Sequence, residues 1–330
     1  MRLFQSSLVE AAPLRLVELP KPRLAHGQVR LRVLACGVCH TDLHIVEGEI
    51  HPPKLPITPG HQVVGIVEAV GHEVGGLHIG DRVGVPWLYN ACRTCEFCLR
   101  GEENLCPRAN FTGFHVNGGF SEFILADARY VLPLPASLSD EQAAPLLCAG
   151  IIGYRSLRKA DLQPGERLGL VGFGASAHLA IQVARDWGCE VYAFTRSKAH
   201  RRHAEELGAV WTGGIEDYPP KLLDRAVLFA PVGDLVPPIL ERLRPGGTLA
   251  INAIYMTPIP KMDYQLIYGE RTVRSVANAT YRDGVDFLQL VDKMQIRSSV
   301  CLYPLTEANR ALLDLKHSRF KGEAVLVIQR

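Results

Sequence analysis

The chain has 330 residues, with 36 basic and 34 acidic side chains and a formal net charge of +2 at pH 7. This balance argues against a dedicated nucleic-acid or membrane-surface binder, and the hydrophobic content of 47% is ordinary for a soluble globular protein. The length suggests two domains. Because no apolar signal segment is visible near the N-terminus, we expect a cytoplasmic protein.

The first part of the chain, residues 1–148, is expected to form a β-rich domain. Short apolar runs at 29–35 and 63–70 predict strands, and Gly and Pro pairs between them predict turns. No internal repeat interrupts this pattern.

Four of the nine cysteines cluster in a lobe at about residues 88–107 with the spacing C-x2-C-x2-C-x7-C. Two C-x2-C turns bring thiolates to one point, and four thiolates fill a tetrahedral zinc ion completely. The pattern therefore predicts a closed structural zinc site, and an iron–sulfur cluster is the alternative that spacing leaves open. The predicted ligands are Cys92, Cys95, Cys98 and Cys106.

From residue 149 to 284 the pattern changes to buried strands that alternate with helices, which is typical of a doubly wound parallel sheet. The strands are predicted at 168–171, 191–195, 226–230, 248–253 and 272–276, and helices at 177–187 and 198–207. A final segment, residues 285–330, ends in a strand at 324–328 that we expect to return to the first domain.

A glycine-rich loop follows the first of these strands and opens a helix, as in dinucleotide-binding folds. Gly172 permits the tight turn, Gly174 lets the backbone approach a pyrophosphate, and the small Ala177 permits close packing of the helix. The free N–H groups of the helix N-terminus favour phosphate binding. The loop sequence G-F-G-A-S-A adds two more cofactor-binding candidates, Phe173 and Ala175.

The second strand of this region ends at Thr195 and Arg196, where NAD-binding proteins usually carry an acidic residue for the ribose 2′-hydroxyl. Thr195 lacks a carboxylate that would repel a 2′-phosphate, and Arg196 could pair with one. We therefore expect NADP to be favoured over NAD. Three further basic residues nearby, at 198, 201 and 202, either add to this preference or form an ordinary solvated helix face.

Cys39, His61 and Cys148 could supply three ligands to a second, open metal site, but each alone is a weak signal. They lie within C-G-V-C-H-T-D, G-H-Q-V-V-G and L-C-A-G, and G-D-R-V stands at 80–83. With the cysteine lobe and the glycine loop in the same order, the whole chain closely resembles the zinc-containing medium-chain dehydrogenase/reductase family, the alcohol dehydrogenases in particular.

The resemblance implies an α/β protein with a GroES-like catalytic domain and a Rossmann domain, which transfers a hydride between an alcohol/aldehyde pair and the cofactor. It implies two zinc ions per chain, with Cys39, His61 and Cys148 holding the catalytic one. Relatives are homodimers or homotetramers. It also implies roles for neighbouring residues. Asp42 would orient His61, Thr41 would take the alcohol proton, and His44 would pass that proton to water. His40 would contact the cofactor pyrophosphate, and Trp87 would narrow the alcohol pocket.

Three features depart from the family pattern. Gln62 stands where the family usually has Glu, which can act as a transient anionic zinc ligand. Asn278-Ala279-Thr280 replaces a common G-N-R, and Lys321-Gly322-Glu323 lacks an arginine that some relatives have. A polyol or formaldehyde-type dehydrogenase and a non-catalytic zinc- and nucleotide-binding redox sensor are the alternative functions.

Overall fold

The structure, a computed structural model, describes residues 1–328, which form two compact units. Unit 1 contains Met1–Ile151, Asn278–Lys293 and the described residues from Arg297 onward. Unit 2 contains Ile152–Ala277 and Met294–Ile296. Each unit has its own sheet, so each is described separately.

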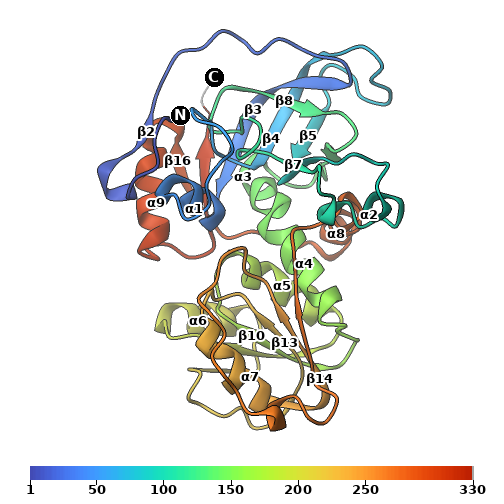
Figure 1. The fold of residues 1–330 in the computed structure, drawn as a ribbon, viewed down its shortest axis with the longest axis vertical. Coiled ribbons are helices and arrows are strands. Elements are labelled where there is room, and N and C mark those ends of the chain that lie inside the picture. The colour runs from blue at the N-terminus through green and yellow to red at the C-terminus, as the bar shows by residue number, and fades with distance from the viewer. Residues whose placement is uncertain (329–330) are drawn as a thin grey trace. The chain divides into compact units, whose positions relative to one another are not determined.

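The described part of unit 1 is built on a mostly antiparallel sheet in the order β16-β17-β3-β4-β5-β9, and β8 also pairs with β3 (Figure 1). Small two-stranded sheets, β1-β2 and β6-β7, accompany it. The strands are β1 (Arg2–Leu3), β2 (Leu14–Arg15), β3 (Gln28–Val38), β4 (Gln62–Val70), β5 (Arg82–Val85), β6 (Leu88–Asn90), β7 (Asn110–Phe111), β8 (Phe123–Asp127), β9 (Leu132–Pro133), β16 (Val300–Pro304) and β17 (Glu323–Val327).

The long strand β3 shows why these residues form a half-buried sheet. Val29, Leu31 and Val33 are buried in the core, while the intervening Arg30 and Arg32 are only half-buried. This period of two is what a strand with one face on a core requires. The strands predicted at 29–35 and 63–70 are therefore confirmed as β3 and β4, each longer than predicted.

The C-terminal strand β17 belongs to the sheet of unit 1. It lies antiparallel to β3, with Ala324 opposite Val38, and parallel to β16. The strand thus joins residues near the C-terminus to the segment that leads into Cys39.

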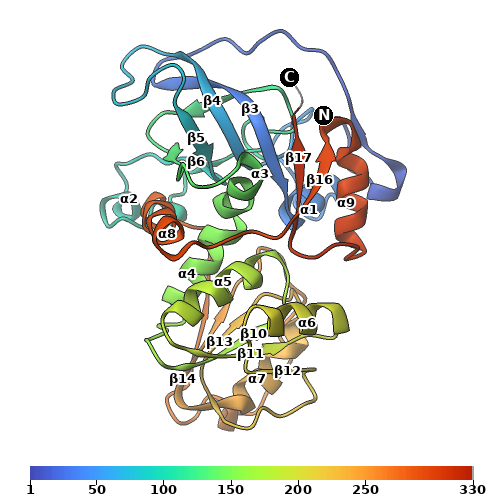
Figure 2. The ribbon, with the colours of Figure 1, turned by 180° about the vertical axis from the view of Figure 1, so that it is seen from behind.

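The helices of unit 1 lie around this sheet, and α1 and α9 lie side by side (Figures 1 and 2). Helix α1 begins directly after Cys39, because Cys39 is extended and the Asp42 carboxylate accepts from its backbone N–H. The α-helices with residues in unit 1 are α1 (His40–Glu47), α2 (Glu96–Leu99), α3 (Asp140–Ala143), α4 (Ala149–Lys159), α8 (Tyr281–Met294) and α9 (Ala308–Lys316).

Within the described residues, unit 2 contains a six-stranded sheet in which all pairings are parallel, in the order β12-β11-β10-β13-β14-β15. Helices α5 and α6 pack on β10, β11 and β12, and α7 packs on β13 and β14. This confirms the doubly wound sheet. The elements are β10 (Arg167–Val171), α5 (Ala175–Asp186), β11 (Glu190–Phe194), α6 (Lys198–Glu206), β12 (Trp211–Gly213), β13 (Leu223–Leu228), α7 (Val236–Arg242), β14 (Leu243–Ile251) and β15 (Thr272–Ser275).

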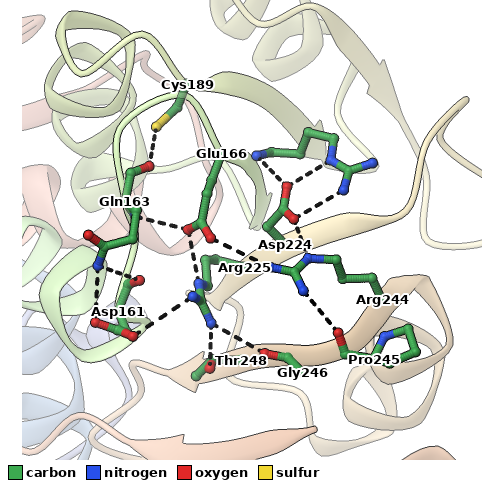
Figure 3. A network of polar contacts seen from close by, with 11 residues as sticks. Asp161, Gln163, Glu166, Cys189, Asp224, Arg225, Arg244, Pro245, Gly246 and Thr248 are labelled. Carbon is green, nitrogen blue, oxygen red and sulfur yellow. Dashed lines mark hydrogen bonds and ion pairs between the residues drawn. The ribbon is translucent and has the colours of Figure 1, made fainter. Parts of the chain in front are cut away.

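Charged side chains gather where β10, β13 and β14 begin, at the edge opposite the glycine loop (Figure 3). Asp224 accepts from the backbone N–H and the Nε of Arg167, at 2.8 and 2.7 Å, and also from Arg244. Arg225 donates to Glu166 at 3.0 Å. Because parallel strands start at the same edge, residues far apart in sequence form one ion-pair network there.

No helix within residues 1–328 is both long and apolar enough to cross a membrane.

Candidate metal and cofactor sites

The four cysteines of the lobe converge on one point. The Sγ atoms of Cys92, Cys95, Cys98 and Cys106 all lie within 4.8 Å of one another, and those of Cys92 and Cys98 are 3.9 Å apart. Four thiolates at 2.3 Å from a tetrahedral ion would be about 3.8 Å apart. The donor set and its spacing therefore fit a zinc ion with no open position.

Backbone N–H groups point at these sulfur atoms, as expected where thiolates are held. The N–H of Cys95 donates to the Cys92 sulfur at 3.3 Å, and the N–H of Arg108 donates to the Cys106 sulfur at 3.4 Å. Hydrogen bonds from the Thr94 backbone and hydroxyl, in that order, contribute most to lowering the pKa of Cys92 to about 5. A lowered pKa favours the thiolate, the form that binds metal.

The second cluster brings together three residues from separate segments of unit 1. Cys39 stands between β3 and α1, His61 immediately precedes β4, and Cys148 immediately precedes α4. Their ligand atoms lie within 4.8 Å of one another. Two sulfur atoms and one imidazole nitrogen leave a tetrahedral ion with one open position, which is the arrangement of catalytic zinc.

Asp42 organises this cluster from a fully buried position. Its carboxylate accepts from the backbone N–H of Cys39 at 3.0 Å, from that of Gly60 at 2.9 Å and from the His61 Nδ1 at 3.2 Å. A carboxylate that accepts from Nδ1 fixes the proton there and leaves Nε2 for a metal. The position of Asp42 in the first turn of α1 therefore sets the orientation of His61.

The His61 Nε2 atom is buried and has no hydrogen-bond partner within the described residues. Such an orphaned atom beside two thiols is what a ligand to an absent ion would show. Burial lowers the pKa of His61, but the Asp42 carboxylate more than offsets it, and the pKa rises to about 10. A metal ion would have to displace that proton on binding.

Two expected relay residues lie on α1. The Thr41 Oγ1 is 3.8 Å from the Cys39 sulfur, so the hydroxyl lies beside the cluster. His44 is mostly buried, and its Nδ1 hydrogen-bonds to the Glu49 carboxylate, which is partly exposed. His40 is exposed in the first turn of the helix.

The Trp87 side chain packs next to His61. The two rings lie edge to face with their centroids 4.9 Å apart. The centroids of Phe111, which stacks on Trp87, and of Phe114 lie 5.0 and 6.0 Å from that of Trp87. The indole N–H donates to the side-chain amide oxygen of Asn278, Oδ1, at 2.9 Å. Asn278 was noted in the sequence only as a departure from a common motif, and no sequence signal linked it to Trp87.

Sequence analysis missed a buried pair beside the cluster. The side-chain amide of Gln62 donates to the carboxylate of Glu323, which lies 261 positions later in the chain, and both side chains are almost fully buried. The only available signal was that both positions depart from the family pattern.

In unit 2 the glycine loop has the expected form. Gly172 has φ +88°, and a Cβ there would lie 2.9 Å from the Ala230 backbone nitrogen, so a larger residue would be strained. Gly174 is the N-cap of α5 and is exposed, while Ala177 is fully buried in the helix–sheet contact. Phe173 is buried and Ala175 begins the helix.

At the end of β11, Arg196 is exposed and Thr195 is half-buried. The N–H of Thr195 donates to Gly213 at 2.8 Å, and Arg201 donates to the carbonyl of Thr195 at 2.8 Å. The Arg201 side chain is thus already hydrogen-bonded to the backbone, while Arg196 is exposed.

Unit 1 carries an open site of two thiols and one imidazole, and unit 2 carries a dinucleotide-binding loop. This combination is typical of a metal-dependent oxidoreductase. The family model described as "Alcohol dehydrogenase GroES-like domain" matches residues 25–136. The "Probable alcohol dehydrogenase AdhA" of Mycobacterium tuberculosis is 46% identical over 326 residues, which cover 97% of this chain and 94% of that protein.

Two solved structures share the whole fold. The chain superimposes on CAD from Helicobacter pylori complexed with NADP(H) with a TM-score of 0.83 and 27% identity, covering 91% of this chain and 90% of that one. An NAD-dependent alcohol dehydrogenase gives a TM-score of 0.89 and 25% identity, covering 100% of each chain. The chain therefore belongs to the zinc-type alcohol dehydrogenases of the medium-chain dehydrogenase/reductase family, which use NAD or NADP.

Proposed function

We propose that this chain oxidises primary alcohols, or reduces the corresponding aldehydes, with zinc held by Cys39, His61 and Cys148 and a second, structural zinc held by the cysteine lobe. The observation that carries the proposal is the convergence of two cysteine sulfur atoms and an orphaned imidazole nitrogen. We propose a GroES-like catalytic domain at residues 1–148, a Rossmann domain at 149–284 and a C-terminal segment at 285–330 that returns to the first domain.

The catalytic zinc, when bound, lowers the pKa of a coordinated hydroxyl group. Thr41 removes the alcohol proton, because its hydroxyl lies beside the cluster and can donate onward at the same time. His44 passes the proton to bulk water, and its bond to the partly exposed Glu49 connects the mostly buried ring with the protein surface. The nicotinamide ring, when bound, would accept a hydride from the alcohol carbon. A relay of this kind typically contributes ~10²–10⁴-fold in rate.

We propose NADP as the preferred cofactor. The pyrophosphate binds the backbone of 172–177 and the N-terminus of α5, where free N–H groups favour anions. Thr195 carries no charge to oppose a 2′-phosphate, and Arg196 is exposed and available to pair with it. By the family resemblance, His40 would contact the pyrophosphate.

Trp87 and its aromatic neighbours restrict the alcohol pocket, because flat, rigid rings beside His61 favour an extended primary alcohol over a branched one. We propose a homodimer or homotetramer as the working assembly.

A substrate panel with both cofactors tests the proposal. The purified zinc enzyme is assayed with primary, secondary and polyol alcohols, and kcat/KM is compared for NADPH and NADH. We expect the highest values with primary alcohols or their aldehydes and a preference for NADPH. A clear preference for NADH would refute the cofactor assignment, and no activity with any alcohol would refute the proposed function.

A further inference from the structure

The buried pair of Gln62 and Glu323 needs an explanation that the family pattern does not provide. Gln62 is fully buried and Glu323 is 1% exposed. The Gln62 amide N–H donates to the Glu323 Oε1, so the side chains at the starts of β4 and β17 meet across the intervening strand β3. Burying a carboxylate is costly unless charge and hydrogen bonds compensate it.

The pair lies close to two ligands of the open metal site. Gln62 directly follows His61, and Glu323 directly precedes Ala324, which pairs with Val38, the residue before Cys39. The chain also leaves space for the pair: a Cβ at Gly37 would lie 2.8 Å from the Gln62 Nε2 and 3.0 Å from the Glu323 Oε1. A side chain at position 37 would therefore displace the ends of these two side chains.

The carboxylate of Glu323 is incompletely satisfied. Its second oxygen, Oε2, is buried without a hydrogen-bond partner within residues 1–328, and no ion pair in that range joins it to a lysine or arginine. A divalent cation held by the cluster would supply the positive charge that Glu323 otherwise lacks.

We propose that Glu323 is an additional, exchangeable carboxylate ligand of the catalytic metal, and that Gln62 positions it. The inference rests on the proposed function, because it requires a metal at Cys39, His61 and Cys148. The carboxylate that the family usually carries directly after the zinc histidine has here moved to the C-terminal strand. The neutral amide at position 62 holds Oε1 and leaves Oε2 free to approach the ion when substrate is absent.

Zinc release tests this proposal without measuring activity. The zinc-loaded wild type, Glu323→Gln and the exchanged variant Gln62→Glu/Glu323→Gln are mixed with excess chelator, and released zinc is followed with a chromogenic indicator. The four-cysteine site serves as an internal reference in each sample. Loss of groups that support a metal site typically costs 10–100-fold in affinity. We therefore expect Glu323→Gln to release its catalytic zinc ~10–100-fold faster, and the exchanged variant to return close to the wild-type rate.

Cobalt substitution gives a second readout. The visible spectrum of the cobalt-loaded enzyme without substrate reports the ligands of the ion, and it should differ between the wild type and Glu323→Gln. Asp314→Asn is the matched control, since Asp314 is a buried carboxylate of the same unit that bonds to Tyr303 and Arg319 instead. The control should change neither the release rate nor the spectrum.

Unchanged zinc release and an unchanged cobalt spectrum in Glu323→Gln would overturn the proposal. If Glu323→Gln does not fold, Glu323→Asp replaces it, because the shorter carboxylate should speed release to an intermediate rate, and a wild-type rate would again overturn the proposal. A wild type that holds metal only at the four-cysteine site would instead overturn the proposed function itself.

Discussion

Replacing Asp224 by Asn tests the ion-pair network at the start of the parallel strands in unit 2. Asp224 is 7% exposed, and each of its carboxylate oxygens accepts two hydrogen bonds. Oδ2 accepts from the N–H and the Nε of Arg167, and Oδ1 accepts from Arg167 at 3.0 Å and from Arg244 (Figure 3).

An asparagine keeps one oxygen and turns an NH2 group toward two of these donors, so two of the four bonds are lost together with the charge. Hydrogen bonds to charged groups contribute about 1.5–3 kcal/mol each, and breaking one partner of a buried pair costs about 3–5 kcal/mol. Because Arg167 and Arg244 are themselves 29% and 39% exposed, solvent screens part of this loss. We expect unit 2 to lose about 3 kcal/mol of unfolding free energy at pH 7.

The network also predicts a pH dependence. The Arg167 and Arg244 guanidinium groups outweigh burial and hold the pKa of Asp224 far below its usual value of 3.8. A carboxyl group with a lowered folded-state pKa stabilises the protein above its unfolded-state pKa and loses that contribution as the pH falls further. The difference between wild type and variant should therefore be constant above about pH 5 and shrink below pH 4.

Denaturant unfolding followed by tryptophan fluorescence measures this effect. In a Trp87→Phe background the remaining tryptophans, Trp187 and Trp211, both lie in unit 2 and report its unfolding. Glu190→Gln is the control, because the Glu190–Lys221 pair on the same sheet is solvent-exposed and should matter far less. Equal stabilities of Asp224→Asn and wild type at pH 7 would show that the network does not stabilise unit 2.

Three further outcomes are expected. Cys148→Ala should retain about one zinc per chain instead of two and lose nearly all turnover; metal analysis and assays check this, and a fully active variant would contradict the ligand assignment. His44→Gln should slow turnover up to ~10²-fold and shift the pH profile of kcat, whereas the exposed His51→Gln should do neither. Burial, followed by the charge of His203, lowers the pKa of His178 to about 4, so the unfolded state binds more protons than the folded state between this value and about 6.5. Stability should therefore fall by as much as about 3 kcal/mol as the pH drops through this window, and His178→Gln should remove that part of the pH dependence in unfolding experiments.

Local patterns in the sequence were sufficient to predict several features of the structure. The four cysteines of the lobe are close in sequence, so their spacing alone predicts that their sulfur atoms can meet. The glycine loop is also local, because a tight turn between a buried strand and a helix needs Gly172 at positive φ. The helix predicted at 177–187 begins two residues earlier, since Gly174 acts as its N-cap.

Other features depended on resemblance rather than on derivation. Separations of 22 and 87 residues between Cys39, His61 and Cys148 carry no geometric information, and only the family motifs suggested that they share an ion. The short edge strand β12 was not predicted, because three residues give too little periodicity to recognise.

Sequence by itself determined the fold class and the residue types available for chemistry, since apolar periodicity and short-range motifs encode strands, helices and turns. The tertiary structure alone decided which distant groups meet. The contact of Trp87 with Asn278 and that of Gln62 with Glu323 each join segments nearly 200 residues or more apart. Such contacts arise from the way distant segments pack together, which no local pattern specifies.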